Sequence, residues 1–346
     1  MTCTICHIIP PHILRGIIKK GNDKQRELVL KTISISEQTR GRREVVSFMP
    51  SLLAAAGQKH RTTYDAKHLS TLPGVLARSE GKPRVKDRTV NEAYDGSGAT
   101  YDFYKNVFGR DSIDDNGMRL DSTVHYDYKY SNAFWNGNQM VYGDGDGQLF
   151  RRFTRSIDVI GHELTHGVTD YEAGLVYRNQ SGALNEHMSD VFGSLLKQYV
   201  RKQTVNKADW LIGKELLTSK VKGKALRSMK EPGTAYDDPL LGKDPQPAHM
   251  DGYVEGDFDN GGVHINSGIP NHAFYLTAMK IGGYGWEKAG KIWYIALRDR
   301  LRPNSNFQDA ANITLEVAAN LFGAGSDEQN AVRSGWEDVG ITITNT

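Results

Sequence analysis

The spacing of apolar residues divides the chain into two unlike parts. Between residues 61 and 155, apolar and polar residues alternate, as they do at 123–130, and this period of two predicts half-buried strands. In the carboxy-terminal half the apolar residues recur about every 3.6 positions, which is the period of an amphipathic helix. The helices expected there cover 270–281, 286–300, 307–322 and 327–336. The pattern therefore predicts an α+β protein with a β-rich amino-terminal part and a mainly helical carboxy-terminal part.

Other segments refine this division. Residues 93–108 have the pattern of a helix within the β-rich part. Residues 132–142 resemble an edge strand, whose free backbone groups can pair with an extended peptide. In the middle of the chain, 158–168 and 182–199 are expected to form two helices separated by a turn at Gly174. These two helices carry the most distinctive chemistry of the sequence.

The first 58 residues differ from the rest. Residues 8–14 are apolar and contain two prolines, whereas 19–43 are rich in charge. Residues 27–35 fit a short strand or a helix, and 52–57 read as a small-residue linker. Apolar residues beside two prolines are seldom left in water, so we expect this separate segment to dock on the remainder of the chain.

Composition excludes several classes of protein. The chain has 346 residues, 38% of them hydrophobic, and a formal net charge of +2 without dense Lys/Arg clusters, so no nucleic-acid partner is expected. No stretch of 18 apolar residues is present, so we expect no membrane span. Cys3 and Cys6 are the only cysteines. The body of the protein is therefore held by packing, and by metals if it binds any, rather than by disulfides.

A zinc-binding pattern lies on the first of the two central helices. His162 and His166 are four residues apart and share one face of a helix, so both imidazoles can reach a single zinc ion. Glu163 is rotated off that face and can reach a water molecule beside the metal. It is expected to be a base rather than a ligand.

The second central helix supplies the expected third ligand. Two histidines and Glu186 make three protein ligands, which leaves a fourth tetrahedral position open. An open position is typical of catalytic zinc sites, whereas structural sites are closed. Asp190 lies one turn after Glu186, where its carboxylate can accept the second N–H of a ligating histidine and fix its tautomer.

Two other functions remain compatible with these residues. The chain could be a zinc-stabilised binding module whose peptide cleft no longer cleaves, although an intact Glu163 beside an open ligand position argues against this. It could also be an aminopeptidase, which would need an acidic group to bind a free amine, and the sequence shows no motif for one. Comparing a blocked with a free-amine peptide would separate the two kinds of peptidase.

Four segments resemble a known family: HELTH at 162–166, GALNEHMSD at 182–190, NAFWNGNQMVYGDGDG at 132–147 and DNGGVHINSGIPN at 259–271. From about Tyr64 onward, the sequence resembles the thermolysin family of neutral zinc metalloproteases. The resemblance implies an α+β, two-lobed fold, with a β-rich amino-terminal lobe, a central helix carrying HExxH and a mainly α carboxy-terminal lobe. It also implies an endopeptidase that hydrolyses internal peptide bonds.

The resemblance implies roles for individual residues. Glu163 would move the proton, His264 and Tyr177 would hydrogen-bond the developing oxyanion, and Asp259 would orient His264. The remaining carried-over residues would bind the substrate, through its backbone or in an apolar pocket: Asn132, Ala133, Arg227, Phe150, Phe153, Val159 and Leu226. An apolar pocket would favour a large hydrophobic residue on the amine side of the cut.

The sequence departs from the family where its well-known members bind two calcium ions. Asp158 and Asp209 remain, but Lys197, Leu211 and Lys214 occupy other acidic positions. Ammonium groups cannot ligate a cation. We therefore expect one catalytic zinc ion and little effect of calcium, with the two lysines pairing with the two remaining aspartates.

The amino-terminal segment is the second departure. Residues 10–14 are similar to the propeptide motif of protealysin-like enzymes, which implies a precursor with a propeptide at 1–55, an amino-terminal lobe at 56–172 and a carboxy-terminal lobe at 173–346. The propeptide would inhibit the enzyme and be removed by it, and Cys3, Cys6, His7 or His12 could cap the zinc. We expect a monomer that acts on proteins or peptides and is secreted without a conventional signal peptide, the alternative being a cytoplasmic enzyme.

Overall fold

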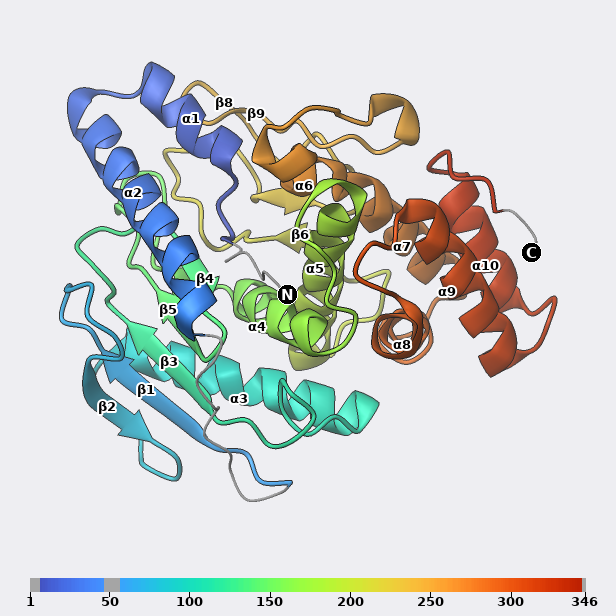
Figure 1. Ribbon diagram of the computed structural model, residues 1–346, viewed down its shortest axis with the longest axis horizontal. Helices are drawn as coiled ribbons and strands as arrows, with labels where there is room; N and C mark the ends of the chain where they lie inside the picture. Colours follow the sequence, from blue (N-terminus) through green and yellow to red (C-terminus); the bar gives the residue numbers. More distant parts are fainter. Residues whose placement is uncertain (1–6, 47–56, 344–346) are drawn as a thin grey trace.

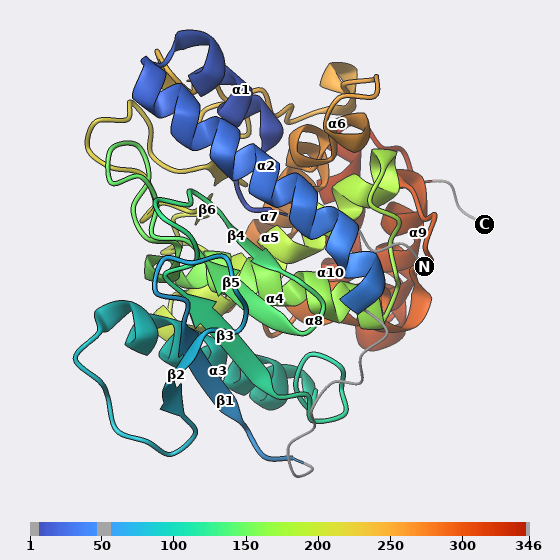
Figure 2. The same ribbon diagram turned by 60° about the vertical axis from the view of Figure 1, so that its left-hand side comes forward.

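The computed structural model describes residues 7–46 and 57–343, and for 38–46 it describes the backbone alone. The chain begins with two helices, α1 (Pro11–Lys20) and α2 (Asp23–Val46), which cross the same side of the molecule (Figures 1 and 2). Pro11 opens α1 at a position where its missing N–H costs nothing. The open choice for 27–35 is thus resolved as helix, and the expected linker at 52–57 lies almost wholly outside the described residues.

The amino-terminal lobe is built on a five-stranded sheet. Its strand order is β2-β1-β3-β5-β4, with β3 parallel to both β1 and β5 and the other pairs antiparallel. The helix α3 (Arg88–Phe108) packs on this sheet, and the Asp87 carboxylate caps its first turn. The strands are β1 (Arg61–Asp65), β2 (Val75–Ser79), β3 (Leu120–Val124), β4 (Ala133–Trp135) and β5 (Gln139–Tyr142).

Two strand predictions need correction. The strand predicted at 123–130 is wrong beyond Val124, because His125, Asp127 and Lys129 have positive φ angles of 53°, 50° and 57° that end the extended ladder. The segment 132–142 forms two strands joined by a turn rather than one. Its first strand, β4, does lie at the edge of the sheet, as expected.

Two long buried helices, α4 (Ile157–Tyr171) and α5 (Asn179–Arg201), pass through the centre of the molecule (Figure 1). Glycines allow them to approach closely. A Cβ atom on Gly161 would lie 2.7 Å from a methyl group of Leu196, and one on Gly193 would collide with the carbonyl oxygen of Asp158. The close contact turns the polar faces of the two helices toward each other and positions the site described below.

The carboxy-terminal lobe is mainly helical, as predicted. The predicted helices at 307–322 and 327–336 are confirmed, and the one at 270–281 begins two residues earlier. The helix predicted at 286–300 starts only at Ala289 and ends in a π-helical turn, Ala296–Arg300. The larger helices are α6 (Asp259–Asn266), α7 (Gly268–Ile281), α8 (Ala289–Ile295), α9 (Phe307–Phe322) and α10 (Asp327–Glu337).

Short strand pairs lie between α5 and α6: β6 (Leu211–Ile212) with β7 (Arg227–Ser228), and β8 (Asp237–Asp238) with β9 (Gly242–Lys243). None of the described helices is long and apolar enough to cross a bilayer.

The sheet of the amino-terminal lobe and the helices of the carboxy-terminal lobe confirm the predicted α+β, two-lobed architecture. The helices α4 and α5 lie between the sheet and the carboxy-terminal helices.

Candidate metal centre and active site

Three buried side chains from α4 and α5 converge on one point. The Nε2 atoms of His162 and His166 lie 3.0 Å apart, and oxygens of Glu186 lie 3.5 Å from the first and 3.4 Å from the second. All three residues are buried, and Glu186 Oε2 has no hydrogen-bond partner among the described residues. Two imidazole nitrogens and a carboxylate oxygen are the ligand set of catalytic zinc. The residues present therefore fit a zinc ion.

The outer nitrogens of both imidazoles are held by α5. His162 Nδ1 lies 2.8 Å from Asp190 Oδ1, and His166 Nδ1 lies 2.7 Å from Asn185 Oδ1. Burial lowers the pKa of His166 to about 3, so this ring is neutral. An N–H on Nδ1 leaves the Nε2 lone pair free, and the hydrogen bonds thus select the tautomer that can bind a metal.

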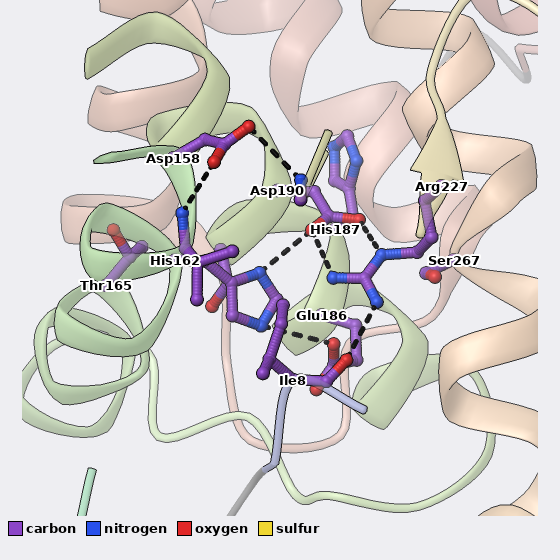
Figure 3. A network of polar contacts seen from close by, with 12 residues as sticks. Ile8, Asp158, His162, Thr165, Glu186, His187, Asp190, Arg227 and Ser267 are labelled. Atoms are coloured by element: carbon purple, nitrogen blue, oxygen red, sulfur yellow. Dashed lines mark hydrogen bonds and ion pairs between the residues drawn. The ribbon is translucent and has the colours of Figure 1, made fainter. Parts of the chain in front are cut away.

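Asp190 is itself held by a buried guanidinium. Arg227 donates from Nε and from a terminal nitrogen to the two Asp190 oxygens, both at 2.8 Å (Figure 3). Burial alone would raise the pKa of Asp190, but the charge of Arg227 and the hydrogen bond of His162 outweigh it and hold that pKa well below its usual range. Asp190 is therefore a permanent carboxylate that orients His162, the position predicted for it.

Glu163 lies beside the three candidate ligands without joining them. Its Oε2 accepts a hydrogen bond of 3.3 Å from the backbone N–H of Trp135 on the edge strand β4, and its Oε1 has no hydrogen-bond partner among the described residues. Burial and then the negative charge of Glu186 raise the pKa of Glu163 well above its ordinary value. A cation at the site acts in the opposite direction. The carboxylate is available to accept a proton.

The three other residues predicted to be catalytic converge beside Glu186. The Tyr177 hydroxyl donates to Glu186 Oε1 and lies 3.1 Å from His264 Nε2. His264 Nδ1 lies 2.7 Å from Asp259 Oδ1, whose second oxygen accepts the backbone N–H of His264 at 2.9 Å. Burial lowers the pKa of His264, but Asp259 and Glu186 outweigh burial and raise it. Two hydrogen-bond donors thus face the centre.

The backbone of the amino-terminal segment enters the site at residues 7–9. The His7 carbonyl lies 3.2 Å from His264 Nε2, the Ile8 carbonyl accepts from Arg227 at 3.3 Å (Figure 3), and the Ile9 N–H donates to Asn132 Oδ1 at 3.1 Å. The sequence indicated that residues 8–14 dock, but it contained no signal for these backbone contacts. Nor did it single out Asn185 or Trp135.

The predicted zinc cap is not formed by the described propeptide. His12 hydrogen-bonds the hydroxyl of Tyr236 at 2.8 Å, and the His7 ring packs on Phe134. The described part of the segment adds no side chain to the group formed by the candidate zinc ligands. Cys3 and Cys6 lie outside the described residues.

The predicted substrate-binding residues are all inside the protein. Ala133 is fully buried on β4, next to Asn132. The four residues predicted to form the apolar pocket belong to one continuous apolar cluster, which also contains Ile8: Phe150, Phe153, Val159 and Leu226. Their burial in the precursor fits both a filled pocket and ordinary core packing.

Lys197 occupies the expected calcium position. Its ammonium lies 3.0 Å from Asp158 and 2.9 Å from Asp209 and donates to the carbonyl of Leu211, while the half-exposed Lys214 lies 3.3 Å from Asp209. Burial lowers the pKa of Lys197, but the two carboxylates outweigh it and raise that pKa. The predicted pairing of lysines with the remaining aspartates is confirmed.

A second cluster, His68, His125 and Asp144, also brings metal-ligating atoms together. There, however, His125 bonds Asp144 through Nδ1 at 2.8 Å and Asp87 through Nε2 at 2.9 Å. Hydrogen bonds to Asp144, which outweigh burial, raise the pKa of His125 to about 9. The imidazolium has no free lone pair at neutral pH, so this cluster is a satisfied ion network rather than a metal site.

Comparison with known proteins agrees with this geometry. Family models match in three places: the thermolysin metallopeptidase catalytic domain at 30–170, its alpha-helical domain at 173–341, and the protealysin propeptide at 6–34. The extracellular metalloprotease of Pectobacterium carotovorum subsp. carotovorum is 52% identical over 344 residues, covering 98% of this chain and 97% of that protein. A thermolysin of Alicyclobacillus acidocaldarius subsp. acidocaldarius is 45% identical over 81% of this chain and 50% of its own length.

A solved structure is similar along nearly the whole chain. The precursor of protealysin, a metalloproteinase from Serratia proteamaculans, superposes with a TM-score of 0.90 at 50% sequence identity, covering 97% of this chain and 100% of that one. The similarity includes the propeptide as well as both lobes. The chain therefore belongs to the thermolysin family of metallopeptidases and carries a protealysin-type propeptide.

Proposed function

We propose that His162, His166 and Glu186 hold the zinc ion of this metalloendopeptidase and that Glu163 is its base. The observation that carries the proposal is the pair of Nε2 atoms 3.0 Å apart beside a buried carboxylate oxygen without a hydrogen bond. Lone pairs facing each other at this distance are unfavourable until a cation lies between them. Bound Zn²⁺ would polarise the substrate carbonyl and lower the pKa of a water molecule.

The surrounding side chains transfer the proton, stabilise the developing negative charge and orient the groups that do so. Glu163 takes a proton from the attacking water and delivers it to the nitrogen of the broken peptide bond, which leaves as an amine. His264 and Tyr177 donate hydrogen bonds to the carbonyl oxygen as its negative charge develops. Asp259 fixes the His264 ring, and the Asp190 carboxylate fixes His162. Because these two carboxylates hold the two rings, little reorientation of the rings is needed during the reaction.

The backbone of residues 7–9 supports inhibition by the propeptide. It occupies the groups expected to bind a substrate: a carbonyl faces His264, the next carbonyl faces Arg227, and the following N–H faces Asn132. This is the order in which a peptide would meet an oxyanion donor and two backbone-binding residues. A second peptide cannot make the same hydrogen bonds while this segment is present.

The side chain of Ile8 supports the expected specificity. Ile8 is 0% exposed, and its apolar side chain belongs to the main hydrophobic core, which also includes the four residues predicted to form the pocket. If its carbonyl marks the residue after the scissile bond, the pocket that holds its side chain receives the residue on the amine side of a cut. An apolar pocket of this kind favours large hydrophobic residues, which is typical of the family.

The precursor organisation follows from these contacts. We propose a propeptide at 1–55, lobes at 56–172 and 173–346, and removal of the propeptide by the enzyme itself. The relative from Pectobacterium carotovorum subsp. carotovorum, which matches nearly the whole chain, is named an extracellular metalloprotease, and this supports the secretion that we propose. The ammonium of Lys197 lies between Asp158 and Asp209, so we propose that calcium matters little at this site. We further propose a monomer with one catalytic zinc ion and with proteins or peptides as its substrates.

The substitution Glu163→Gln tests the base and the processing together. We expect it to reduce cleavage of internal peptide bonds by at least about a hundredfold, because general base catalysis contributes that much or more. The variant should keep one zinc ion per chain and stay full length, while the wild type shortens to a start within 50–58. Undiminished turnover would remove Glu163 from the mechanism, and loss of zinc would show that the ligands are misassigned.

A further inference from the structure

Behind the zinc ligand His162, buried side chains form an unbroken series of hydrogen bonds. Trp293 Nε1 lies 2.8 Å from His187 Nε2, and His187 Nδ1 lies 2.8 Å from Asn271 Oδ1. Asn271 Nδ2 lies 2.9 Å from Asp190 Oδ2, and the other oxygen of Asp190 bonds His162. All five residues are 0% exposed. The series links α8 and α7 of the carboxy-terminal lobe to the zinc-binding helix α4, and Figure 3 shows His187 beside the Asp190–Arg227 pair.

The two ends of this series, an indole that can only donate and a carboxylate that can only accept, agree on the direction of every bond between them. An indole N–H can only donate, so His187 Nε2 must accept. The proton of the neutral ring then sits on Nδ1 and is donated to Asn271 Oδ1. With its oxygen engaged, Asn271 turns its NH₂ group toward Asp190.

Removing the indole donor would release the tautomer of His187. Asp190 is a carboxylate and can only accept, so Asn271 still turns its NH₂ group toward it. When the His187 proton moves to Nε2, however, Asn271 Oδ1 faces the unprotonated Nδ1 and loses its donor in a buried site. Trp293 therefore selects the one tautomer of His187 in which Asn271 is held from both sides while it donates to Asp190.

We propose that Trp293, His187 and Asn271 are positioning residues that hold Asp190, and through it His162, in the orientation that binds zinc. The inference rests on the proposed zinc site. Partners of a ligating histidine commonly change metal affinity by ten- to a hundredfold. Asp190 keeps both bonds from Arg227 when the series is broken. The more distant residues should therefore have a smaller effect, on the order of three- to tenfold.

The test measures how fast zinc leaves the full-length chain. Zinc transfer to a chromogenic chelator is followed in the Glu163→Ala background, where self-cleavage should not interfere. We expect Trp293→Phe to release zinc about three- to tenfold faster than its parent, and Asn271→Leu about tenfold faster. Cobalt replaces zinc in a second measurement, and its visible absorption bands should shift in both variants because the ligand geometry changes.

A matched control lies beside the indole of Trp293. Trp336 is also 0% exposed, stacks on Trp293 with ring centroids 6.2 Å apart, and donates from Nε1 to Thr314 at 2.9 Å. Trp336→Phe deletes the same N–H from the same core but leaves the series intact. It should match its parent in zinc release and in the cobalt spectrum.

The outcomes separate this inference from the function on which it rests. Equal zinc release and equal cobalt spectra in Trp293→Phe and Trp336→Phe would overturn the positioning role. If Trp293→Phe does not fold, Asn271→Leu is judged against Trp336→Phe by the same criteria. A parent that carries no zinc to transfer would instead overturn the proposed metal site. So would zinc binding that is unchanged by His162→Ala.

Discussion

The helices α4 and α5 carry two buried sites that contain carboxylates, and only one of the two includes a positively charged side chain to neutralise them. At the metal centre, His162, His166 and Glu186 face one another without an internal cation. A few turns away, Lys197 places an ammonium 3.0 Å from Asp158 and 2.9 Å from Asp209. We call the first the open site, because we propose that it takes a zinc ion from solution, and the second the closed site, because Lys197 supplies its cation. The comparison shows two ways in which buried carboxylates on the same helices can be neutralised.

Removal of zinc should produce the largest contrast. A zinc-selective chelator should lower peptide hydrolysis by about a thousandfold or more, because the metal contributes several kcal/mol of transition-state stabilisation. Re-addition of zinc should restore activity and calcium should not. Retained activity after exhaustive chelation, with zinc shown to be absent by elemental analysis, would contradict the assignment of the open site.

Lys197→Met tests the closed site. The loss of the ammonium leaves the buried Asp158 without its partner, so we expect the free energy of unfolding to fall by about 1 to 3 kcal/mol. Lys214→Met is the control, and this half-exposed residue should contribute less than about 0.5 kcal/mol. Denaturant unfolding of the Glu163→Ala precursor measures both. A wild-type melting temperature that rose by tens of degrees on addition of calcium would show that the site is not closed.

Acid should weaken the docking of the propeptide at the open site and leave the ion pairs of the closed site intact. Burial lowers the pKa of His12 to about 4 from 6.5, against the opposing pull of Asp259 and alongside the like charges of His264 and Arg227. The released segment therefore binds a proton that the docked segment does not. Docking is unaffected above pH 6.5, weakens by up to about tenfold per pH unit below it, and changes no further once His12 is protonated in both states near pH 4.

Hydrogen–deuterium exchange of α1 between pH 7 and pH 5 measures this effect in the Glu163→Ala precursor. His12→Gln can keep a hydrogen bond to Tyr236 but cannot titrate, so its exchange should lose most of the pH dependence. The Lys197 pairs should persist through the same range, because the charge of Lys197 outweighs burial and lowers the pKa of Asp209. Equal pH dependence in wild type and His12→Gln would contradict the assignment.

The sequence predicts the open site better than the contacts around it. Helical periodicity fixes His162 and His166 on one face, and the same spacing places Asp190 one turn after Glu186, so these positions follow from local geometry. The backbone hydrogen bonds of residues 7–9 do not, because their partners lie more than a hundred residues away. The sequence also does not predict that the strand ends before His125. The carbonyl of His125 accepts a hydrogen bond from the N–H of His68, which lies on another loop.

The contact between Gly193 and the carbonyl of Asp158 has a consequence for how the two sites evolve. A Cβ atom at this position would collide with that carbonyl and would lie 3.2 Å from the backbone nitrogen of His162. Asp158 belongs to the closed site and His162 to the open one, so Gly193 contributes to the helix spacing at both. Any larger side chain at this position would change the two sites together.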